Sequence, residues 1–410
     1  MDYEYRGIEQ LSHRLNAKKK RIDLRYDYYD MKNSVWDFDI STPPGLRDFK
    51  AVMGWAAKGV DSLADRLSVR GFGGGDFFGM QQIYALNNQD VLFDSAILGA
   101  LISACSFIYI SRDENGLPRL QAIDGGNATG VIDPITSMLH EGYAVLERDD
   151  NGKPTLEAYF TADSTTVFRH DGWQRVTVAR EANPAPWALL VPVIYRPSAS
   201  RPFGHSRISR AGMSYIQSAA RTLKRSEIAA EFYSYPQKWI VGTDDAQTKG
   251  QAWRASMSSF FEITKGEDGD VPKVGQFSAA SMEPHIAQLR MIASLFAGET
   301  GLTLDDLGFA TENPSSAEAI KASHENLRLA ARKAQKDFSV GIKNAGYLAA
   351  CVRDDTRYLR TDLADTTVLW EPIFESDASM LAGIGDGLAK LEQQFPGYIT
   401  QDKLKDLIGF

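Results

Sequence analysis

The sequence of 410 residues predicts an α+β fold, in which long helices and an antiparallel sheet occupy separate stretches of the chain. Three observations predict it. Helical apolar spacing runs through residues 206–235 and again beyond residue 316, short β-prone segments fill about 105–200, and a small mixed insertion occupies 236–283. The hydrophobic content of 43% is enough to bury a substantial core.

The first hundred residues are expected to be mostly helical. Residues 8–30 are polar and aromatic with a basic cluster at 18–21, and residues 46–67 carry apolar residues at helical spacing; both segments are expected to be helical. The segment GFGGGDFFG, 71–79, is interpreted as a flexible loop, because Asp76 stands where a phosphate-binding GxGxxG motif needs its third glycine. The apolar stretch 95–111 contains polar serines and ends in the β-prone letters FIYI. We therefore expect a helix followed by a buried strand there, not a membrane span.

Turn dipeptides organise the next hundred residues. Asn115-Gly116, Asn151-Gly152 and Asp171-Gly172 each lie between β-rich runs such as TLEAYF and TTVF. Such dipeptides are typical of two-residue hairpin turns. The pattern predicts an antiparallel meander over about 105–200, which Arg196-Pro197 brings to an end.

Two helices flank the insertion. The helix over 206–235 carries small and apolar residues on one face, among them Gly212, Tyr215, Ala219 and Ala230. We expect this stripe to allow close approach of a neighbouring subunit, because no monomeric core obviously needs it. After Pro236 the insertion is expected to hold a strand at 239–241, a helix at 246–261 and the strand-like VGQFS. A second helix then follows over 284–302.

A loop and a very long helix come next. Residues 303–315 lack helical periodicity and are expected to form a loop. Ser315 and Glu318 match a capping box at the start of a helix that continues to about residue 350. Its stripe is narrow for its length, so much of its surface is expected to face neighbours or solvent. That stripe consists of Ile320, Leu327, Ala331, Ala334, Phe338, Ile342 and Ala345.

Charge and motifs exclude several function classes. The net charge of −8 argues against a general nucleic-acid binder. The motifs GxxxxGK[ST], HExxH and GxSxG are absent, so we expect no cofactor and no metal. His324 lies on the apolar stripe and is expected to be a packed or interface histidine. The pair Asp305-Asp306 has no third acid nearby and is interpreted as loop charge. Cys105 and Cys351 are expected to be buried free thiols of a cytoplasmic protein.

The order of these elements resembles the tailed-phage portal proteins, in particular their siphophage branch. The segments GETGLTLDDLGF and NPSSAEAIKASHENL are similar to that branch, as is GVDSLADRLSVRGF upstream. The resemblance implies a portal-like fold with an antiparallel meander in the wing and a small α/β clip. It assigns a wing at 1–205, a stem helix at 206–235, a clip at 236–283, a stem helix at 284–302, a tunnel loop at 303–315, a long wing helix at 316–352 and a short crown-like region at 353–410.

The resemblance also implies a function. Such proteins form a ring, typically of twelve copies, at one capsid vertex, through which double-stranded DNA is packaged and ejected without sequence-specific binding. The implied partners are the terminase large subunit, a head-completion or adaptor protein, and the major capsid and scaffolding proteins. The implied location is the virion, and the host cytoplasm during assembly. No membrane partner is expected.

The resemblance places the functional residues in three groups. The stem interface would use Gly212, Tyr215, Ala219 and Ala230. The tunnel loop would present Asp305, Asp306, Gly308, Phe309, Glu312 and Asn313 to DNA, and it is expected to be mobile. The clip would dock terminase and adaptor through an anionic surface, for which a solvated loop is the alternative; its acids are Asp244, Asp245, Glu262, Glu267, Asp268 and Asp270.

Two other functions stay open at this point. The chain could be an enzyme of unrecognised type, with the meander as catalytic domain and 236–283 as a lid. It could also be another virion ring such as a head-tail connector, although those chains are usually much shorter. Uniform rings in negative-stain microscopy would favour the portal, and a compact monomer would favour the enzyme.

Overall fold

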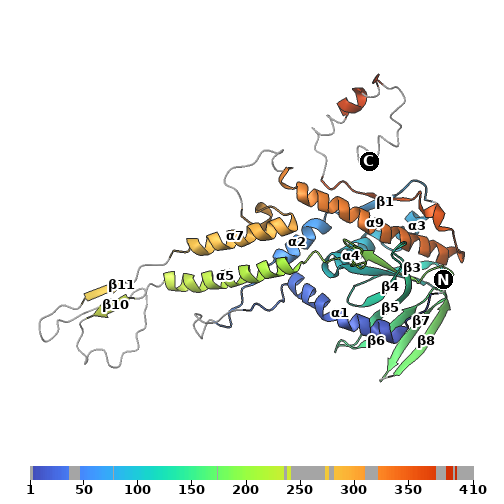
Figure 1. The fold of residues 1–410 in the computed structure, drawn as a ribbon, viewed down its shortest axis with the longest axis horizontal. Helices are drawn as coiled ribbons and strands as arrows, with labels where there is room; N and C mark the ends of the chain where they lie inside the picture. Colours follow the sequence, from blue (N-terminus) through green and yellow to red (C-terminus); the bar gives the residue numbers. More distant parts are fainter. Residues whose placement is uncertain are drawn as a thin grey trace.

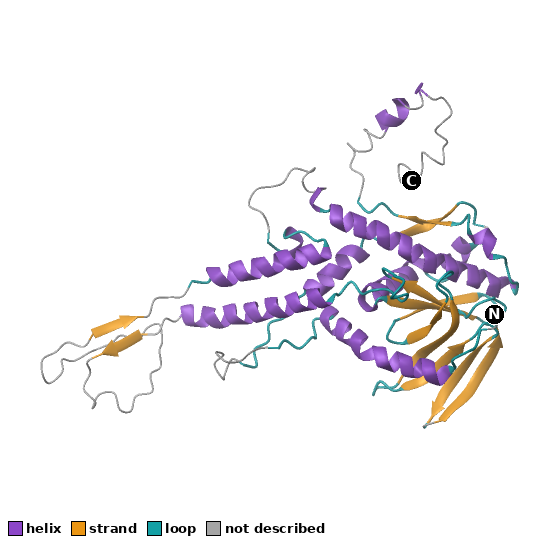
Figure 2. Cartoon of the chain, viewed as in Figure 1, coloured by secondary structure: helices purple, strands orange, loops and turns teal. Residues whose placement is uncertain are grey.

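The computed structural model shows a mixed body of helices and sheets from which two long helices project side by side (Figures 1 and 2). It describes residues 3–36, 47–76, 78–172, 174–234, 238–241, 273–276, 281–309, 322–374, 385–390 and 393–394. The prediction of a mixed fold of helices and antiparallel sheets is confirmed.

Four helices form the N-terminal part of the body: α1 (Ile8–Tyr29), α2 (Trp55–Ala64), α3 (Met80–Ala85) and α4 (Gln89–Ser103). α2 is shorter than the helix expected over 46–67. Phe49 and Val52, which suggested the longer helix, are 45% and 58% exposed, and residues 49–53 have no regular structure. The carbonyl of Arg47 instead accepts a hydrogen bond from Lys224 at 2.9 Å. The segment before α2 is thus held by a contact with α5 (Arg210–Ser234) and does not extend the helix.

Two antiparallel sheets share the predicted meander. The larger sheet has the order β4-β5-β6-β7-β8, and the smaller has the order β3-β2-β9. The bounds are β2 (Cys105–Arg112), β3 (Pro118–Ile123), β4 (Ala128–Ile132), β5 (Leu139–Arg148), β6 (Pro154–Phe160), β7 (Ser164–Asp171), β8 (Gln174–Ala182) and β9 (Leu190–Ile194). The last strand therefore leaves the meander and pairs with β2, with Cys105 opposite Ile194.

The three turn dipeptides connect the strands that they were expected to connect. Gly116 lies between β2 and β3, Gly152 between β5 and β6, and Gly172 between β7 and β8. All three have positive φ, at 82°, 76° and 62°. Glycine adopts this conformation without a steric penalty, which is why the dipeptides identified the hairpins from sequence.

The glycine-rich segment 71–79 is not the simple loop that the sequence suggested. Its first residues belong to β1 (Val69–Gly73), which pairs antiparallel with β12 (Thr367–Trp370). Asp76 then accepts hydrogen bonds from the backbone amides of Met80 and Gln81 at 2.6 and 3.0 Å, at the start of α3. Asp76, whose presence argued against a phosphate-binding loop, therefore satisfies the free backbone amides in the first turn of α3.

α9 (Glu325–Asp354) crosses the body as its central helix. The expected stripe is confirmed from Leu327 to Ala345, since all its described members are buried. The expectation that much of the helix faces neighbours or solvent is wrong for its C-terminal half. That half packs against β2, β3 and β9 of the small sheet and against α3. The residues buried there are Asn344, Ala345, Gly346, Tyr347, Leu348, Ala349, Ala350, Cys351 and Val352.

The paired helices are α5 (Arg210–Ser234) and α7 (Glu283–Thr300). At their far end β10 (Lys238–Val241) pairs antiparallel with β11 (Lys273–Gln276) (Figure 1). These two strands match the expected strand at 239–241 and part of VGQFS. The helix expected at 246–261 lies outside the described residues.

Two further expectations can be compared with the structure. Cys105 and Cys351 are both buried and free. Among the helices described, none has the length and apolar character needed to cross a bilayer.

Candidate functional site at the base of the paired helices

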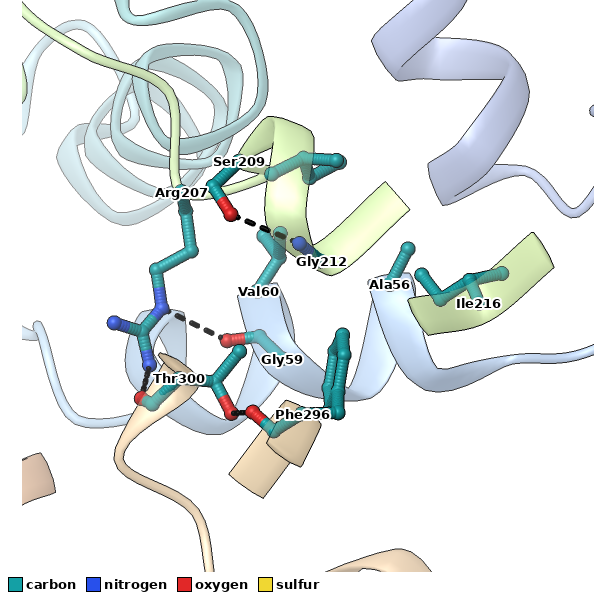
Figure 3. A pocket seen from close by; sticks show the side chains of 10 residues that line it. Ala56, Gly59, Val60, Arg207, Ser209, Gly212, Ile216, Phe296 and Thr300 are labelled. Atoms are coloured by element: carbon teal, nitrogen blue, oxygen red, sulfur yellow. Dashed lines mark hydrogen bonds between the residues drawn. The ribbon is translucent and has the colours of Figure 1, made fainter. Parts of the chain in front are cut away.

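The paired helices join the body at a packed junction formed by α2, α5 and α7 (Figure 3). Phe296 of α7 is 2% exposed and lies between the two other helices. The remaining space admits about one water molecule. The junction is therefore a packing contact between helices and too small to be a pocket for a ligand.

Arg207 connects the two sides of this junction. Its Nε donates to the Gly59 carbonyl in α2 at 3.0 Å, and its Nη2 donates to the Thr300 carbonyl in α7 at 2.5 Å (Figure 3). Thr300 is the last residue of α7, so its carbonyl has no partner within the helix. The planar guanidinium can reach both carbonyls at once because its donors point in fixed, divergent directions.

Two glycines lie beside the Phe296 ring at this junction. A Cβ placed on Gly59 would lie 3.4 Å from the Phe296 ring, and one on Gly212 would lie 3.5 Å from it. Gly212 also donates its amide to Ser209 Oγ at 3.0 Å, in the first turn of α5. Both distances are ordinary van der Waals contacts, so side chains larger than alanine at either glycine would meet this buried ring.

The stripe expected at a subunit interface is partly used inside the subunit. Gly212 packs on Phe296, and Ala219 is fully buried. The expectation that no monomeric core needs these two residues is wrong. Tyr215 and Ala230 are half-buried.

The segment that follows α7 is a folded turn as far as Phe309. Gly301 ends the helix with φ 73°, and the 3₁₀ turn η2 (Asp305–Leu307) follows. Asp306 Oδ2 accepts hydrogen bonds from the amide and the hydroxyl of Thr303, at 2.9 and 2.8 Å. Leu307 is 9% exposed and packs into the core, so this part of the expected loop is anchored to the body.

The four described residues of the predicted tunnel loop have different environments. Asp305 is exposed, whereas Asp306 is held in the turn and is more than a surface charge. Gly308 adopts φ 89° and ends the 3₁₀ turn, and Phe309 packs against the core. Of these four, Asp305 and Gly308 are the ones whose surface faces solvent.

His324 lies beside this turn, at the N-cap position of α9 instead of inside its stripe. Its Nδ1 is 3.8 Å from Asp306 Oδ2, and its ring centroid is 6.2 Å from that of Phe374. The histidine is packed, as expected. Through it the turn after α7 touches the start of the central helix.

Several predicted residues lie outside the described part of the chain. They are Glu312 and Asn313 of the tunnel loop, Ser315 and Glu318 of the capping box, Ile320, and the clip acids Asp244, Asp245, Glu262, Glu267, Asp268 and Asp270. Their roles stay predictions.

Two buried carboxylates in the large sheet were missed by the sequence analysis. Glu141 on β5 is fully buried and accepts hydrogen bonds from the hydroxyls of Tyr3 and Tyr159, at 2.9 and 2.8 Å. It also accepts from the amides of Arg6 and Gly7, just before α1. Burial, and then the Glu141 carboxylate, raises the pKa of Tyr3 to about 12, so the phenol remains a donor.

Glu157 on β6 is the second buried carboxylate and is 2% exposed. Tyr143 and Arg175 donate to it at 2.5 and 2.6 Å, and His170 Nε2 lies 3.1 Å away. Burial alone would raise the pKa of Glu157, but these partners outweigh it and hold the pKa below its usual range. Arg175 also pairs with Glu9 of α1. In the sequence, the buried role of Glu157 was indicated only by its position as a charged residue within a predicted strand.

Both carboxylates fasten α1 and the residues before it to the sheet. Each accepts hydrogen bonds from several donors, which is the arrangement expected of a structural network. Within the described residues, no group of three or more His, Cys, Asp or Glu side chains could hold a metal ion.

Comparisons with known proteins identify relatives of this chain. Residues 8–384 match the family model described as "Phage portal protein, SPP1 Gp6-like". The portal protein of Mycobacterium phage L5 is 27% identical over 346 residues, covering 78% of this chain and 68% of that protein. The portal protein of Mycobacterium phage D29 is 26% identical over 330 residues, covering 73% of this chain and 65% of that protein. The chain thus spans about two thirds of the length of these relatives.

Solved structures are also similar. A chain of the virion of the native gene transfer agent particle has a TM-score of 0.47 at 14% identity, with 87% of this chain and 89% of that chain covered. A chain of the neck of the native particle, computed with C12 symmetry, has a TM-score of 0.46 at 13% identity with the same coverage.

Proposed function

Because the chain belongs to the SPP1 Gp6-like family of phage portal proteins, we propose that it forms a closed ring at one capsid vertex, through which double-stranded DNA is packaged and ejected. The observation that carries this proposal is the match of residues 8–384 to that family. It is supported by two long helices that project from the body and end in a small two-stranded tip. Twelve is the copy number that the family resemblance implies.

In this proposal the paired helices α5 and α7 are the stem and line the channel. The tip, 236–283, is the clip, where the terminase large subunit and later a head-completion or adaptor protein dock. The body is the wing, which meets the major capsid and scaffolding proteins. The protein thus acts in the virion, after assembly in the host cytoplasm.

The outer face of α7 supports contact between copies. Met291 and Leu295, four residues apart, are 56% and 48% exposed, and Gly298 on the same face has no atom within 4 Å of an added Cβ. Apolar side chains at helical spacing gain free energy when a neighbour covers them, at roughly 25 cal/mol per Å². Since Gly212 and Ala219 are already covered within the subunit, we assign the stem contact to this face of α7.

The described part of the tunnel loop supports a revised picture of its function. Residues 303–309 form an anchored turn, and Asp305 is its exposed charge. We propose that this turn fixes the origin of the loop, and that Asp305 contributes negative charge near the DNA path. Like charge repels phosphates, so DNA would pass without being held.

Microscopy of the purified protein tests the ring directly. Negative-stain images should show closed rings of uniform size, and native mass spectrometry should give one dominant oligomer. A chain that stays monomeric at micromolar concentration would contradict the proposal.

A further inference from the structure

A small cavity lies where the two sheets of the body meet. Its walls come from β2 of the small sheet, from β7 and β8 of the large sheet, and from the segment that leads to β9. The cavity has room for about one water molecule. Its polar lining includes Tyr109, Thr165 and Glu181. We call this space the sheet cavity.

The hydroxyl of Thr165 is the unusual group in this lining. The residue is 6% exposed, and its Oγ1 is buried with no hydrogen-bond partner in the described part of the chain. A buried hydroxyl that forms no hydrogen bond is unfavourable, because it gives up its bonds to water and gains nothing in return. Ordered water is the usual partner of a buried polar group that finds none within the protein.

Glu181 and Tyr109 supply the other polar groups. Glu181 lies directly opposite Thr165 in the β7–β8 ladder, so their side chains project from the same face of the large sheet. Tyr109 belongs to β2, and its ring packs against Phe160 of the large sheet with the centroids 5.2 Å apart. Burial, and then the Glu181 carboxylate, raises the pKa of Tyr109. The phenol therefore keeps its proton and can donate it in a hydrogen bond.

These three groups match the bonding capacity of one water molecule. Water can accept hydrogen bonds from the hydroxyls of Thr165 and Tyr109 and donate one to the Glu181 carboxylate. A buried water typically makes about three such bonds. A cation suits the cavity less well, because the guanidinium of Arg112 also lines it and would repel positive charge.

We propose that the sheet cavity binds one ordered water molecule, which bridges Thr165 on β7 to Tyr109 on β2 and to Glu181 on β8. The bridge holds the β7–β8 hairpin, at the edge of the large sheet, against the small sheet. It is a property of the single subunit, so it goes beyond the proposed function and does not depend on ring formation.

Thr165→Val tests the bridge through the sign of its effect on stability. Valine keeps the branched shape that suits a strand but lacks the hydroxyl. With a bridging water, the substitution removes one of its partners, and we expect the equilibrium constant for unfolding in urea to rise about fivefold. Without a water, it removes an unsatisfied hydroxyl, so the variant should be at least as stable as the wild type.

Thr177→Val is the matched control, because Thr177 lies on β8 and is exposed. It measures the effect of the same chemical change on a strand away from the cavity, and we expect little change in stability. All variants are compared at one protein concentration, since any oligomerisation adds to the apparent stability.

A double-mutant cycle tests whether two hydroxyls share the water. Tyr109→Phe alone should also destabilise the protein. Combined with Thr165→Val, it should cost less than the sum of the two single changes, because both changes weaken the binding of the same molecule. The pair Thr165→Val and Thr177→Val should be additive.

A crystal structure of the wild-type chain that resolves ordered waters gives the direct observation. We expect one water within hydrogen-bond distance of Thr165 Oγ1. Three results would each overturn the proposal: a sheet cavity without a water in that structure, a Thr165→Val chain as stable as the wild type, or additive losses for Thr165→Val and Tyr109→Phe. The crystal structure needs no substitution, so it decides the question even if a variant does not fold.

Discussion

Arg207 shows how one side chain can join the paired helices to the body. Its guanidinium satisfies the last carbonyl of α7 and also reaches α2. A lysine has a point charge in place of a planar fork and cannot reproduce both hydrogen bonds. The position of the stem relative to the body therefore depends on the shape of this residue as well as its charge.

Replacing Arg207 by alanine should lower the free energy of unfolding by about 1.5–3 kcal/mol, the usual range for hydrogen bonds that involve a charged group. Arg207→Lys should recover part of that loss. Urea unfolding monitored by circular dichroism measures both. Arg290→Ala, on the exposed face of α7, is the matched control and should cost about 0.5 kcal/mol or less. Equal losses at the two arginines would contradict the role assigned to Arg207.

Glu157 gives the large sheet a defined response to acid. Because its folded-state pKa is depressed, its contribution to stability is present above the unfolded pKa of about 4.3 and is lost as pH falls through the folded value. Glu157→Gln should therefore reduce stability at pH 7 and flatten the decline below about pH 4. Thermal melts from pH 3 to pH 7 test this, with the exposed Glu147→Gln as control. Parallel pH profiles for wild type and Glu157→Gln would refute it.

At the scale of elements, turns and helices could be predicted from neighbouring residues, whereas the pairing of strands that are distant in the sequence could not. The dipeptides at Gly116, Gly152 and Gly172 identified three hairpins because a positive φ is a property of the residue itself. The stripe from Leu327 to Ala345 identified α9 because helical spacing is also local. By contrast, β1 pairs with β12 across some three hundred residues, and nothing near Gly71 in the sequence indicates this partner.

The candidate site was predicted in part, for a related physical reason. Small residues on α5 correctly indicated close packing, but spacing cannot tell whether the covering helix belongs to the same chain or to a neighbour. Phe296 of the same subunit covers Gly212. Similarly, the absence of periodicity indicated a loop after α7, but the bonds between Thr303 and Asp306 make its first part a fixed turn. The buried partners of Glu141 come from the N-terminus and a distant strand, and no local pattern shows them.

The anchored turn after α7 changes how the predicted loop should be tested. Reversing the charge of Asp305 and Asp306 together would also remove the bonds between Asp306 and Thr303, so it could not isolate the effect of charge. Asp305→Lys alone would add positive charge around the bore under the proposed function, and it leaves the bonds between Asp306 and Thr303 in place. We expect rings that assemble normally but package DNA more slowly, with the defect easing as salt rises because phosphate contacts are screened.

Packaging assays at several salt concentrations measure this effect, and Asp305→Asn is the control for loss of charge without reversal. Ring formation has to be confirmed first, since a variant that fails to assemble says nothing about the loop. Wild-type packaging rates for Asp305→Lys at every salt concentration would remove Asp305 from the DNA path.

At the scale of the whole molecule, the proposed function as a DNA channel requires no catalytic activity of the chain itself. The chain lacks the phosphate-loop motif that nucleotide hydrolysis would need. We expect purified rings to show no ATPase and no nuclease activity, measured by phosphate release and by intact plasmid DNA after incubation. Turnover that follows the ring through successive purification steps would show that an active site has been overlooked.

Ring closure should depend on the outer face of α7. Met291 is 56% exposed in the subunit, so covering the rest of its side chain contributes about half of the roughly 1.5–3 kcal/mol that full burial gives. Met291→Glu would place a charge in that contact, so we expect rings to require at least tenfold more protein to form. The subunit itself should fold as the wild type does, because the substituted side chain faces solvent.

The control for this prediction is Val178→Glu, the same kind of change at a residue that is 53% exposed on β8, far from the stem. If both variants weaken assembly equally, the effect is one of net charge and not of the α7 contact. If neither does, the stem helices meet through another face. Assembly measured by native mass spectrometry over a concentration series separates these cases, because a lost contact shifts the midpoint for Met291→Glu alone.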